Sequence, residues 1–298
     1  MNAINPNLRG QLLVREKLAK YTSWRVGGEA ERMYIPADKQ DLQYFIASLP
    51  VDEQVFWLGL GSNLLIRDGG LRGTVINLRG KVKKMELLDD TRVYVESGIP
   101  CAHVAKYCAE RGLTGAEFLA GIPGTMGGAL KMNAGAFGSD TWSLVESVET
   151  MQVGGELLER KADSFDVAYR SVKGVDNACF LSAILKLSTG MQLNSQEKIK
   201  QLLAQRAATQ PTNQPTCGSV FKNPQDDYSA RLIEASGLKG YRIGGAEVST
   251  KHANFIVNTG TASALDIEQL IEYVQAEVAK QQGVELQTEV CIIGNKRT

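Results

Sequence analysis

Apolar residues recur every three or four positions in several segments of the 298-residue chain, which predicts amphipathic helices there. The clearest runs from Ser263 to about Gln281 and has apolar residues along one face. Asp38 is a suitable N-cap for a second helix, whose apolar face includes Phe45. The remaining helices are predicted at 100–110, at 194–208 and around Leu232. The apolar side of the helix at 194–208 is expected to carry Ile199, Leu202 and Leu203.

Short apolar runs bounded by glycine, proline or aspartate predict strands among these helices. They span 30–37, 54–61, 73–78, 82–88, 91–97, 143–153, 180–188 and 284–294. The segment TSWRVGG, at 22–28, is consistent with a surface hairpin ahead of the first strand. Strand, helix and strand in succession predict a small α/β lobe at 1–80. An α+β lobe at 81–194 and a third lobe at 195–298 are expected to follow.

The composition is that of a soluble globular protein, with 43% hydrophobic and 22% charged residues. The 33 basic and 33 acidic residues balance, so the chain carries no electrostatic footprint for nucleic acid or membrane surfaces. No apolar run approaches the ~20 residues of a membrane span, and the N-terminal sequence has no signal-peptide core. We therefore expect a cytoplasmic protein.

Cysteine and histidine usage argues against a metal or disulfide framework. The five cysteines form no CxxC pair, so neither a disulfide scaffold nor a zinc site is expected. The chain has only two histidines, His103 and His252, which excludes a His-rich metal site and leaves few candidates for a Ser-His-Asp triad.

The stretch GIPGTMGGALKMNAGAFG, at 121–138, has six glycines in eighteen residues but is too apolar for a disordered linker. Pro123 pushes Ile122 toward an extended conformation, and Thr125 is then a suitable helix N-cap. The amides that follow, at 126–128, are expected to be unpaired and to attract a phosphate group. The alternative is a close-packed turn in a core. The GxxxxGK pattern of a P-loop is absent.

A second glycine turn, Gly59-Leu60-Gly61, follows a predicted strand but lacks the third glycine of a dinucleotide-binding fingerprint. A dinucleotide held between two sub-lobes would explain both glycine turns.

Three polar residues are candidates for catalytic chemistry. Arg170 lies in a polar turn, where a guanidinium can grip a carboxylate through two hydrogen bonds. Ser219 lies between glycine and an apolar pair and could donate a proton or bind phosphate, although the GxSxG elbow of hydrolases is absent. Glu289 interrupts the alternation of the last predicted strand, just before the apolar run that starts at Val290, and a carboxylate next to a buried run needs a partner or changes its pKa. An outward-facing surface residue is the alternative for Glu289.

Several segments together resemble the family of UDP-N-acetylenolpyruvoylglucosamine reductases, in its shorter subclass. They are TSWRVGG, GLGSNLLI, GAEFLAGIPGTMGGALKMNAGAFG, YRS, GSVFKNP, GGAEVSTKHANFIVN and TEV. The resemblance covers nearly the whole chain in the family's order. It implies an α+β fold, with a two-lobed FAD-binding domain of the vanillyl-alcohol-oxidase (PCMH) type and a C-terminal α+β substrate-binding domain at 195–298.

The resemblance also implies roles for individual residues. The positions matching the family's flavin-binding turns are Gly61, Ser62, Asn63, Gly121, Ile122, Pro123, Gly124, Thr125, Gly127 and Gly128. The positions matching its catalytic residues are Arg170, Ser219 and Glu289. The substrate-binding motifs contain Tyr169, Lys222, Asn223 and Lys251. Neither histidine falls in a flavin motif, so FAD is expected to be noncovalent.

The implied reaction has two halves, in which NADPH reduces the flavin and the flavin then reduces the enolpyruvyl group of a UDP-sugar for peptidoglycan synthesis. Arg170 and Glu289 would stabilise the developing negative charge, and Ser219 would supply a proton. No obligate protein partner is implied. Two alternatives remain: a flavin-dependent oxidase of a small alcohol or sugar on the same fold, and a noncatalytic regulator that binds a nucleotide sugar.

Overall fold

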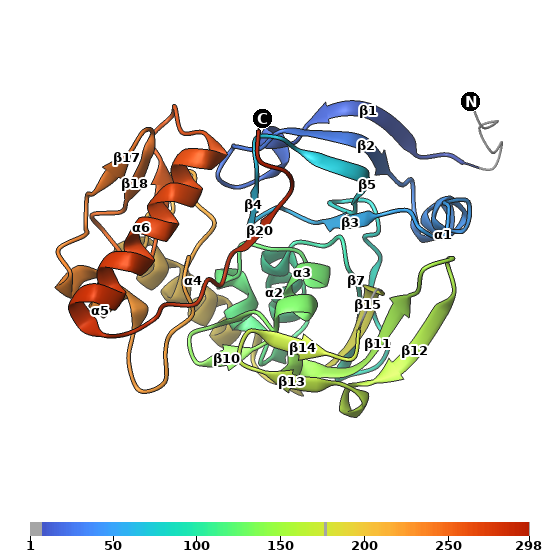
Figure 1. Cartoon of the computed structure of the whole chain (residues 1–298). Coiled ribbons are helices and arrows are strands. Elements are labelled where there is room, and N and C mark those ends of the chain that lie inside the picture. Colours follow the sequence, from blue (N-terminus) through green and yellow to red (C-terminus); the bar gives the residue numbers. More distant parts are fainter. Residues whose placement is uncertain (1–7, 176–177, 298) are drawn as a thin grey trace. The chain divides into compact units, whose positions relative to one another are not determined.

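The computed structural model describes residues 8–175 and 178–297, which form two compact units (Figure 1). The first unit contains the described residues of 8–13, 32–60 and 73–204. The second contains 14–31, 61–72 and 205–297. Each unit is therefore assembled from stretches that are distant in the sequence.

The first unit contains a five-stranded antiparallel sheet, with strands in the order β12-β11-β15-β7-β6. The strands are β6 (Met85–Leu87), β7 (Arg92–Glu96), β11 (Val145–Met151), β12 (Leu157–Lys161) and β15 (Cys179–Lys186). The central strand β15 is buried along most of its length because α3 and other core elements pack on it. The strands predicted at 82–88 and 91–97 are confirmed as β6 and β7, which pair in an antiparallel arrangement.

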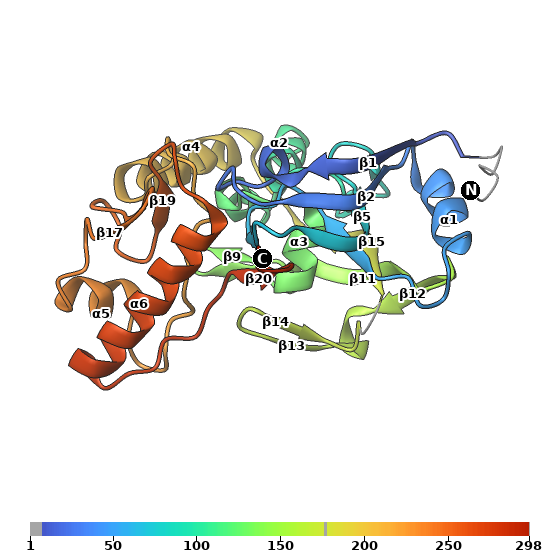
Figure 2. The same ribbon diagram turned by 45° about the horizontal axis from the view of Figure 1, so that its top comes forward.

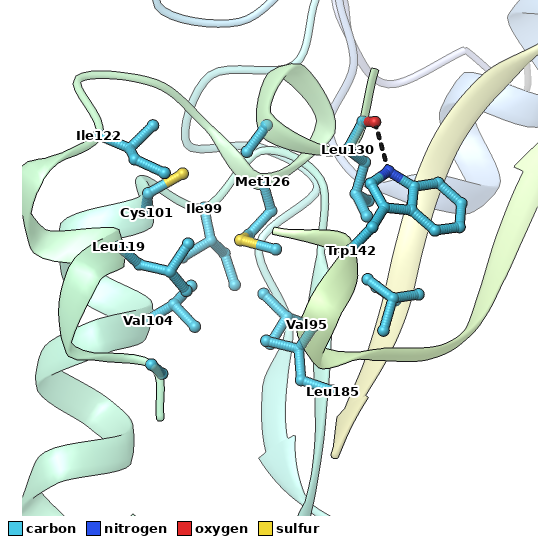
Figure 3. Close-up of a cluster of buried hydrophobic side chains, with 14 of the residues drawn as sticks. Val95, Ile99, Cys101, Val104, Leu119, Ile122, Met126, Leu130, Trp142 and Leu185 are labelled. Atoms are coloured by element: carbon cyan, nitrogen blue, oxygen red, sulfur yellow. Dashed lines mark hydrogen bonds between the residues drawn. The ribbon is translucent and has the colours of Figure 1, made fainter. Parts of the chain in front are cut away.

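Two helices complete the core of this sheet, α2 (Cys101–Glu110) and α3 (Met126–Met132). Figure 3 shows Met126 directed into the same cluster as Val95, Ile99 and Leu185. The indole nitrogen of Trp142 donates to the carbonyl of Leu130 over 2.8 Å, which satisfies its one polar atom inside the core. The start of α3 is thus fixed by packing on the sheet.

A four-stranded sheet has the order β1-β2-β5-β3. Its strands are β1 (Gln11–Lys17), β2 (Glu29–Ile35), β3 (Val55–Leu58) and β5 (Leu71–Asn77). In the first unit, Tyr34 of β2 stacks on Phe45 of α1 (Lys39–Ala47) with ring centroids 3.7 Å apart. The predicted N-cap is confirmed, since the Asp38 side chain accepts a hydrogen bond from the Asp41 amide.

The second unit has its own core, around α6 (Ala264–Gln282). This helix packs on a small antiparallel sheet of β17 (Arg242–Ile243), β18 (Ala246–Val248) and β19 (Ile256–Asn258) (Figure 2). The predicted apolar face is buried, and Ser263 is the N-cap in a capping box with Asp266. The other elements are α5 (Ser229–Ala235) and the parallel pair β4 (Leu64–Ile66) and β20 (Cys291–Ile293).

The remaining elements are short, except for α4 (Gln192–Thr209). The 3₁₀ helices are η1 (Leu18–Tyr21), η2 (Glu117–Gly121), η3 (Trp142–Leu144) and η4 (Ala162–Ser164). The two-stranded pairs are β8 (Leu113–Thr114) with β16 (Ser188–Thr189), β9 (Gly135–Ala136) with β10 (Ser139–Asp140), and β13 (Asp166–Ala168) with β14 (Ser171–Lys173). Within the described ranges, no helix has the length and apolar character needed to cross a membrane.

Three predictions about packing are wrong. Leu203 is 42% exposed, and the covered face of α4 follows Ser195, Ile199 and Leu202 instead. The last strand is limited to β20, and its first residue, Cys291, is exposed. The segment at 22–28 is no surface hairpin, because Trp24 is completely buried in the core of the second unit.

The side chain of Trp24 is anchored as well as buried. Its indole nitrogen donates to the carbonyl of Ile256 over 2.7 Å, and its own carbonyl accepts from the Asn258 side chain. The described apolar residues gather in three clusters, two in the first unit and one in the second. The division at 1–80, 81–194 and 195–298 stays a prediction.

Candidate active site

The glycine-rich stretch at 121–138 forms a turn, the helix α3 and a tight hairpin. Ile122 is extended, as predicted from the following proline. Thr125 is the N-cap of α3, although its side chain makes no capping hydrogen bond. The prediction of unpaired amides is wrong for two of the three positions. Met126 donates to the carbonyl of Ile99 and Gly127 to the carbonyl of Ser97, each over 2.9 Å.

The two glycines at the start of α3 have different surroundings. A Cβ on Gly127 would lie 2.8 Å from the Cβ of Ser97, so this glycine is required by packing inside the protein. Gly128 is exposed, and a Cβ there would meet only Thr125 Oγ1, at 3.9 Å. Gly59 lies on the other side of this threonine, where a Cβ would be 2.5 Å from the hydroxyl oxygen. The open face beside Thr125 and Gly128 fits a polar ligand that approaches the backbone closely.

We expect Gly128→Val to weaken FAD binding without lowering the melting temperature of the flavin-free protein, because the added methyl groups extend into the open face. Gly127→Val should weaken FAD binding and also lower the melting temperature, because the valine side chain collides with Ser97. Flavin fluorescence titration and thermal melting of both variants make the comparison. Unchanged FAD affinity in Gly128→Val would mean that the flavin does not approach this backbone.

Glu117 anchors the 3₁₀ helix that leads into the glycine turn. Its buried carboxylate accepts from the Gly115 amide over 2.9 Å and from the Ser195 hydroxyl over 2.7 Å, and Lys198 Nζ lies 3.6 Å away. Burial alone would raise the pKa of this carboxyl, but the hydrogen bonds and the lysine outweigh it and lower the pKa. The carboxylate thus ties η2, and with it Gly121, to α4.

The other predicted flavin turn, at 61–63, lies in the second unit and is tied to its backbone. Gly61 has a φ of +60°, and a Cβ there would be 2.2 Å from the carbonyl oxygen of Tyr21. The Asn63 side chain donates to the carbonyl of Glu289 over 3.0 Å, and the Asn63 carbonyl accepts from the Cys291 amide. Ser62 is half-buried. These contacts are structural, and the flavin-binding role of the turn stays a prediction.

Ser219 and Glu289 come close together in the second unit through their neighbours. The amide of Glu289 donates to the carbonyl of Val220 over 2.8 Å, and Phe221 pairs with Thr288 in an antiparallel bridge. Both Ser219 and Glu289 are half-buried. The backbone of Glu289 therefore joins the residue after Ser219 to the side chain of Asn63, although Glu289 borders no buried strand.

The predicted substrate-binding residues of the second unit also make structural contacts. The Asn223 side chain accepts from the Ser229 amide over 3.2 Å at the start of α5. Lys222 uses both backbone groups, donating to Gln287 and accepting from Ser229. The Lys251 ammonium donates to the carbonyl of Ala207 in the last turn of α4, where a cation is favoured. Their roles toward a substrate stay predictions.

Arg170 lies in the first unit, at the turn between β13 and β14, with a φ of +54°. Its guanidinium donates to the carbonyl of Asn133 over 3.3 Å and to that of Gly135 over 3.1 Å. Asn133 ends α3 in a left-handed conformation, and the negative end of a helix favours a cation. Tyr169 is 55% exposed, with its ring centroid 5.1 Å from the guanidinium carbon.

Asn133 and Gly135 were not among the predicted site residues. The only sequence signal was the tolerance of asparagine for left-handed backbone, which marks a helix end but says nothing of the arginine that uses its carbonyl.

The described residues contain no group of three His, Cys, Asp or Glu side chains that could hold a metal ion. Burial raises the pKa of the thiols of Cys101 and Cys217 to about 12, so these cysteines are thiols at neutral pH.

Comparisons with known proteins match nearly the whole chain. A profile described as FAD binding domain matches residues 30–160, and one described as UDP-N-acetylenolpyruvoylglucosamine reductase, C-terminal domain, matches 210–293. The chain is 57% identical over 286 residues to a protein of that name from Methylococcus capsulatus, covering 96% of this chain and 94% of the relative. Identity to the protein of that name from Nitrosococcus oceani is 54%, over 97% of both chains.

The solved structure of UDP-N-acetylenolpyruvylglucosamine reductase from Thermus caldophilus is also similar. It has a TM-score of 0.82 at 30% identity, with 96% of this chain and 99% of the other covered. Together with the FAD binding domain match, this confirms the predicted fold class.

Proposed function

The chain belongs to the UDP-N-acetylenolpyruvoylglucosamine reductase family, and from this we propose that it reduces the enolpyruvyl group of UDP-N-acetylglucosamine enolpyruvate to give UDP-N-acetylmuramate. The observation that carries the proposal is the near-full-length match at 57% identity. Arg170, Ser219 and Glu289, the three residues that the family resemblance assigns to catalysis, are all present in the chain. The product is a precursor of peptidoglycan.

Bound FAD would supply the chemistry of hydride transfer between NADPH and the terminal vinyl carbon of the substrate. We assign its binding to the turns at 61–63 and 121–128. The fit rests on the open face beside Thr125 and Gly128. Since neither histidine lies in these turns, the flavin is held without a covalent bond.

The chain's own residues stabilise charge and supply a proton. Arg170 pairs with the substrate carboxylate, where negative charge grows during the transfer, and its two carbonyl contacts hold the guanidinium plane in a fixed orientation. Ser219 donates a proton through its hydroxyl to the carbon next to that carboxylate. Glu289 assists either in its protonated form or by orienting a neighbouring donor.

We place this reaction in the cytoplasm, where NADPH and nucleotide sugars are available, with these two molecules as the only partners of the enzyme. The proposal needs no second protein, nucleic acid or membrane surface.

The absorption spectrum of the purified protein tests the proposal first. We expect a yellow protein whose flavin bands follow it on gel filtration and are released by acid. NADPH should bleach the bands, and the enolpyruvyl nucleotide sugar should restore them without oxygen. If only oxygen restores the flavin bands, and the protein turns over a small alcohol or sugar, the protein is the flavin-dependent oxidase of the first alternative. A folded, colourless protein with no affinity for FAD would contradict both flavoenzyme functions and favour the noncatalytic regulator that binds a nucleotide sugar.

A further inference from the structure

The hairpin formed by β9 and β10 has an unusual residue at its tip. Ala136 pairs with Ser139, so Phe137 and Gly138 are the two loop residues, with φ of +55° and +83°. Two positive φ angles define a type I′ turn, where Asn-Gly is the preferred pair. Left-handed backbone is costly for a bulky side chain such as phenylalanine. Backbone strain of this kind is a guide to function.

The ring of Phe137 lies against the glycine turn at Gly121. A Cβ on Gly121 would be 2.5 Å from Cε2 and 3.2 Å from Cζ of the ring. The ring therefore occupies the space that any other residue at 121 would need. Gly121 ends η2, which Glu117 ties to α4, so the ring rests on a fixed support. Phe137 is still 37% exposed, so its position is not determined by burial in a core.

The base of the same hairpin holds Arg170. The guanidinium donates to the carbonyl of Gly135, the first residue of β9, and to that of Asn133. The Ala134 carbonyl between them accepts from both the amide and the hydroxyl of Thr141, which closes the base of the hairpin. One short element thus touches the flavin turn at its tip and the catalytic arginine at its base.

We propose that Phe137 is a positioning residue: by resting on Gly121, its ring fixes the hairpin that orients Arg170 relative to the flavin turn at 121–124. This rests on the proposed function, since it assigns Arg170 to the enolpyruvyl carboxylate. The ring itself touches no substrate in this scheme. Losing it lets the hairpin tip move, and the carbonyls that hold the guanidinium move with it.

Phe137→Ala should slow the recovery of flavin absorbance by the enolpyruvyl substrate at least ~10-fold, since small misplacements of reacting groups are costly. Bleaching by NADPH, which does not use Arg170, should change much less. FAD should also dissociate faster from the variant holoenzyme, as measured by the rise in flavin fluorescence on dilution. Phe137→Tyr keeps the ring and should behave like the wild type. Equal slowing of both half-reactions would contradict a positioning role.

Gly121→Ala provides the decisive comparison, because its added Cβ displaces the ring. Alone, it should reproduce the Phe137→Ala defects in substrate-driven recovery and FAD release. In the Phe137→Ala background it should add almost nothing, since the colliding ring is gone. A Gly121→Ala defect of the same size in both backgrounds would overturn the proposal.

The two proposals fail in different ways. If the wild-type flavin is not restored by the enolpyruvyl nucleotide sugar, the proposed function is wrong. In that case, the rates of FAD dissociation from the Gly121→Ala and Phe137→Ala variants, alone and combined, still test whether the two residues act together. If the wild type is active but Phe137→Ala recovers at the normal rate and retains FAD normally, the positioning role is wrong and the function stands.

Discussion

Ser219→Ala should slow the recovery of flavin absorbance on adding the enolpyruvyl nucleotide sugar by about 10²–10⁴-fold, the usual cost of losing a general acid. Bleaching by NADPH should proceed at close to the wild-type rate, because this half-reaction needs no proton from the serine. Stopped-flow absorbance of the holoenzyme, first with NADPH and then with substrate, measures the two steps separately.

The contacts around Ser219 indicate that Ser219→Ala removes the hydroxyl without disturbing the fold. The next residue, Val220, is held by backbone hydrogen bonds, donating to the carbonyl of Asn254 and accepting from the amide of Glu289, and neither uses the serine hydroxyl. Removing that oxygen should therefore leave the adjacent backbone in place. Ser219→Cys should retain part of the activity, because a thiol offers a proton from nearly the same position.

Ser236→Ala is a suitable control in the same unit, since its hydroxyl bonds only within its own helix turn, to the Leu232 carbonyl. It should leave both half-reactions unchanged. Normal recovery of the flavin absorbance in Ser219→Ala would show that the proton comes from another group, and the assignment of Ser219 would be wrong.

Arg170→Lys should slow the same substrate-driven step by about 10²–10³-fold, as expected when one preorganised electrostatic contact to the developing charge is lost. Lysine keeps the positive charge, but its single ammonium cannot contact the carbonyls of Asn133 and Gly135 and also present a planar fork to a carboxylate. NADPH bleaching should be affected less. The melting temperature should change little, because the turn at Arg170 is at the surface end of a short hairpin.

Arg160→Lys is the matched control for this prediction. Arg160 also donates to two backbone carbonyls, those of Gly174 and Ser164, but it is not one of the proposed catalytic residues. It should leave the substrate-driven step intact. If Arg170→Lys impaired both half-reactions equally, or if Arg160→Lys had the same effect, Arg170 would have only a structural role.

Local signals in the sequence were sufficient for most helices. Asp38 was identified as an N-cap, and Ser263 as the start of a helix, because both signals depend on residues within one helical turn. The buried face of α6 followed from its 3.6-residue period. The predicted apolar face of α4 was wrong, because Leu203 was assigned to it from its apolar side chain. The covered side instead includes a polar residue, Ser195, whose hydroxyl donates to the buried carboxylate of Glu117.

The candidate site was predicted less completely than the fold, because its geometry depends on distant partners. Nothing local indicates that the Met126 and Gly127 amides bond to the carbonyls of Ile99 and Ser97. The same applies to Asn63, whose side chain bonds to Glu289, 226 positions away. The catalytic set came from the family resemblance, since an arginine, a serine and a glutamate in separate segments carry no shared pattern.

The burial of Trp24 determines how late during synthesis the second unit can complete its core. Its indole bonds to a carbonyl 232 residues later, which is on the order of 10–50 s of synthesis at ~5–20 residues per second. Strand β4 waits nearly as long, because Leu64 pairs with Cys291 of β20, and 291 − 64 is 227 positions. The core of the second unit therefore closes only after β20 has been made. Until then the apolar indole of Trp24 is exposed, and chaperone binding to the nascent chain should concentrate there.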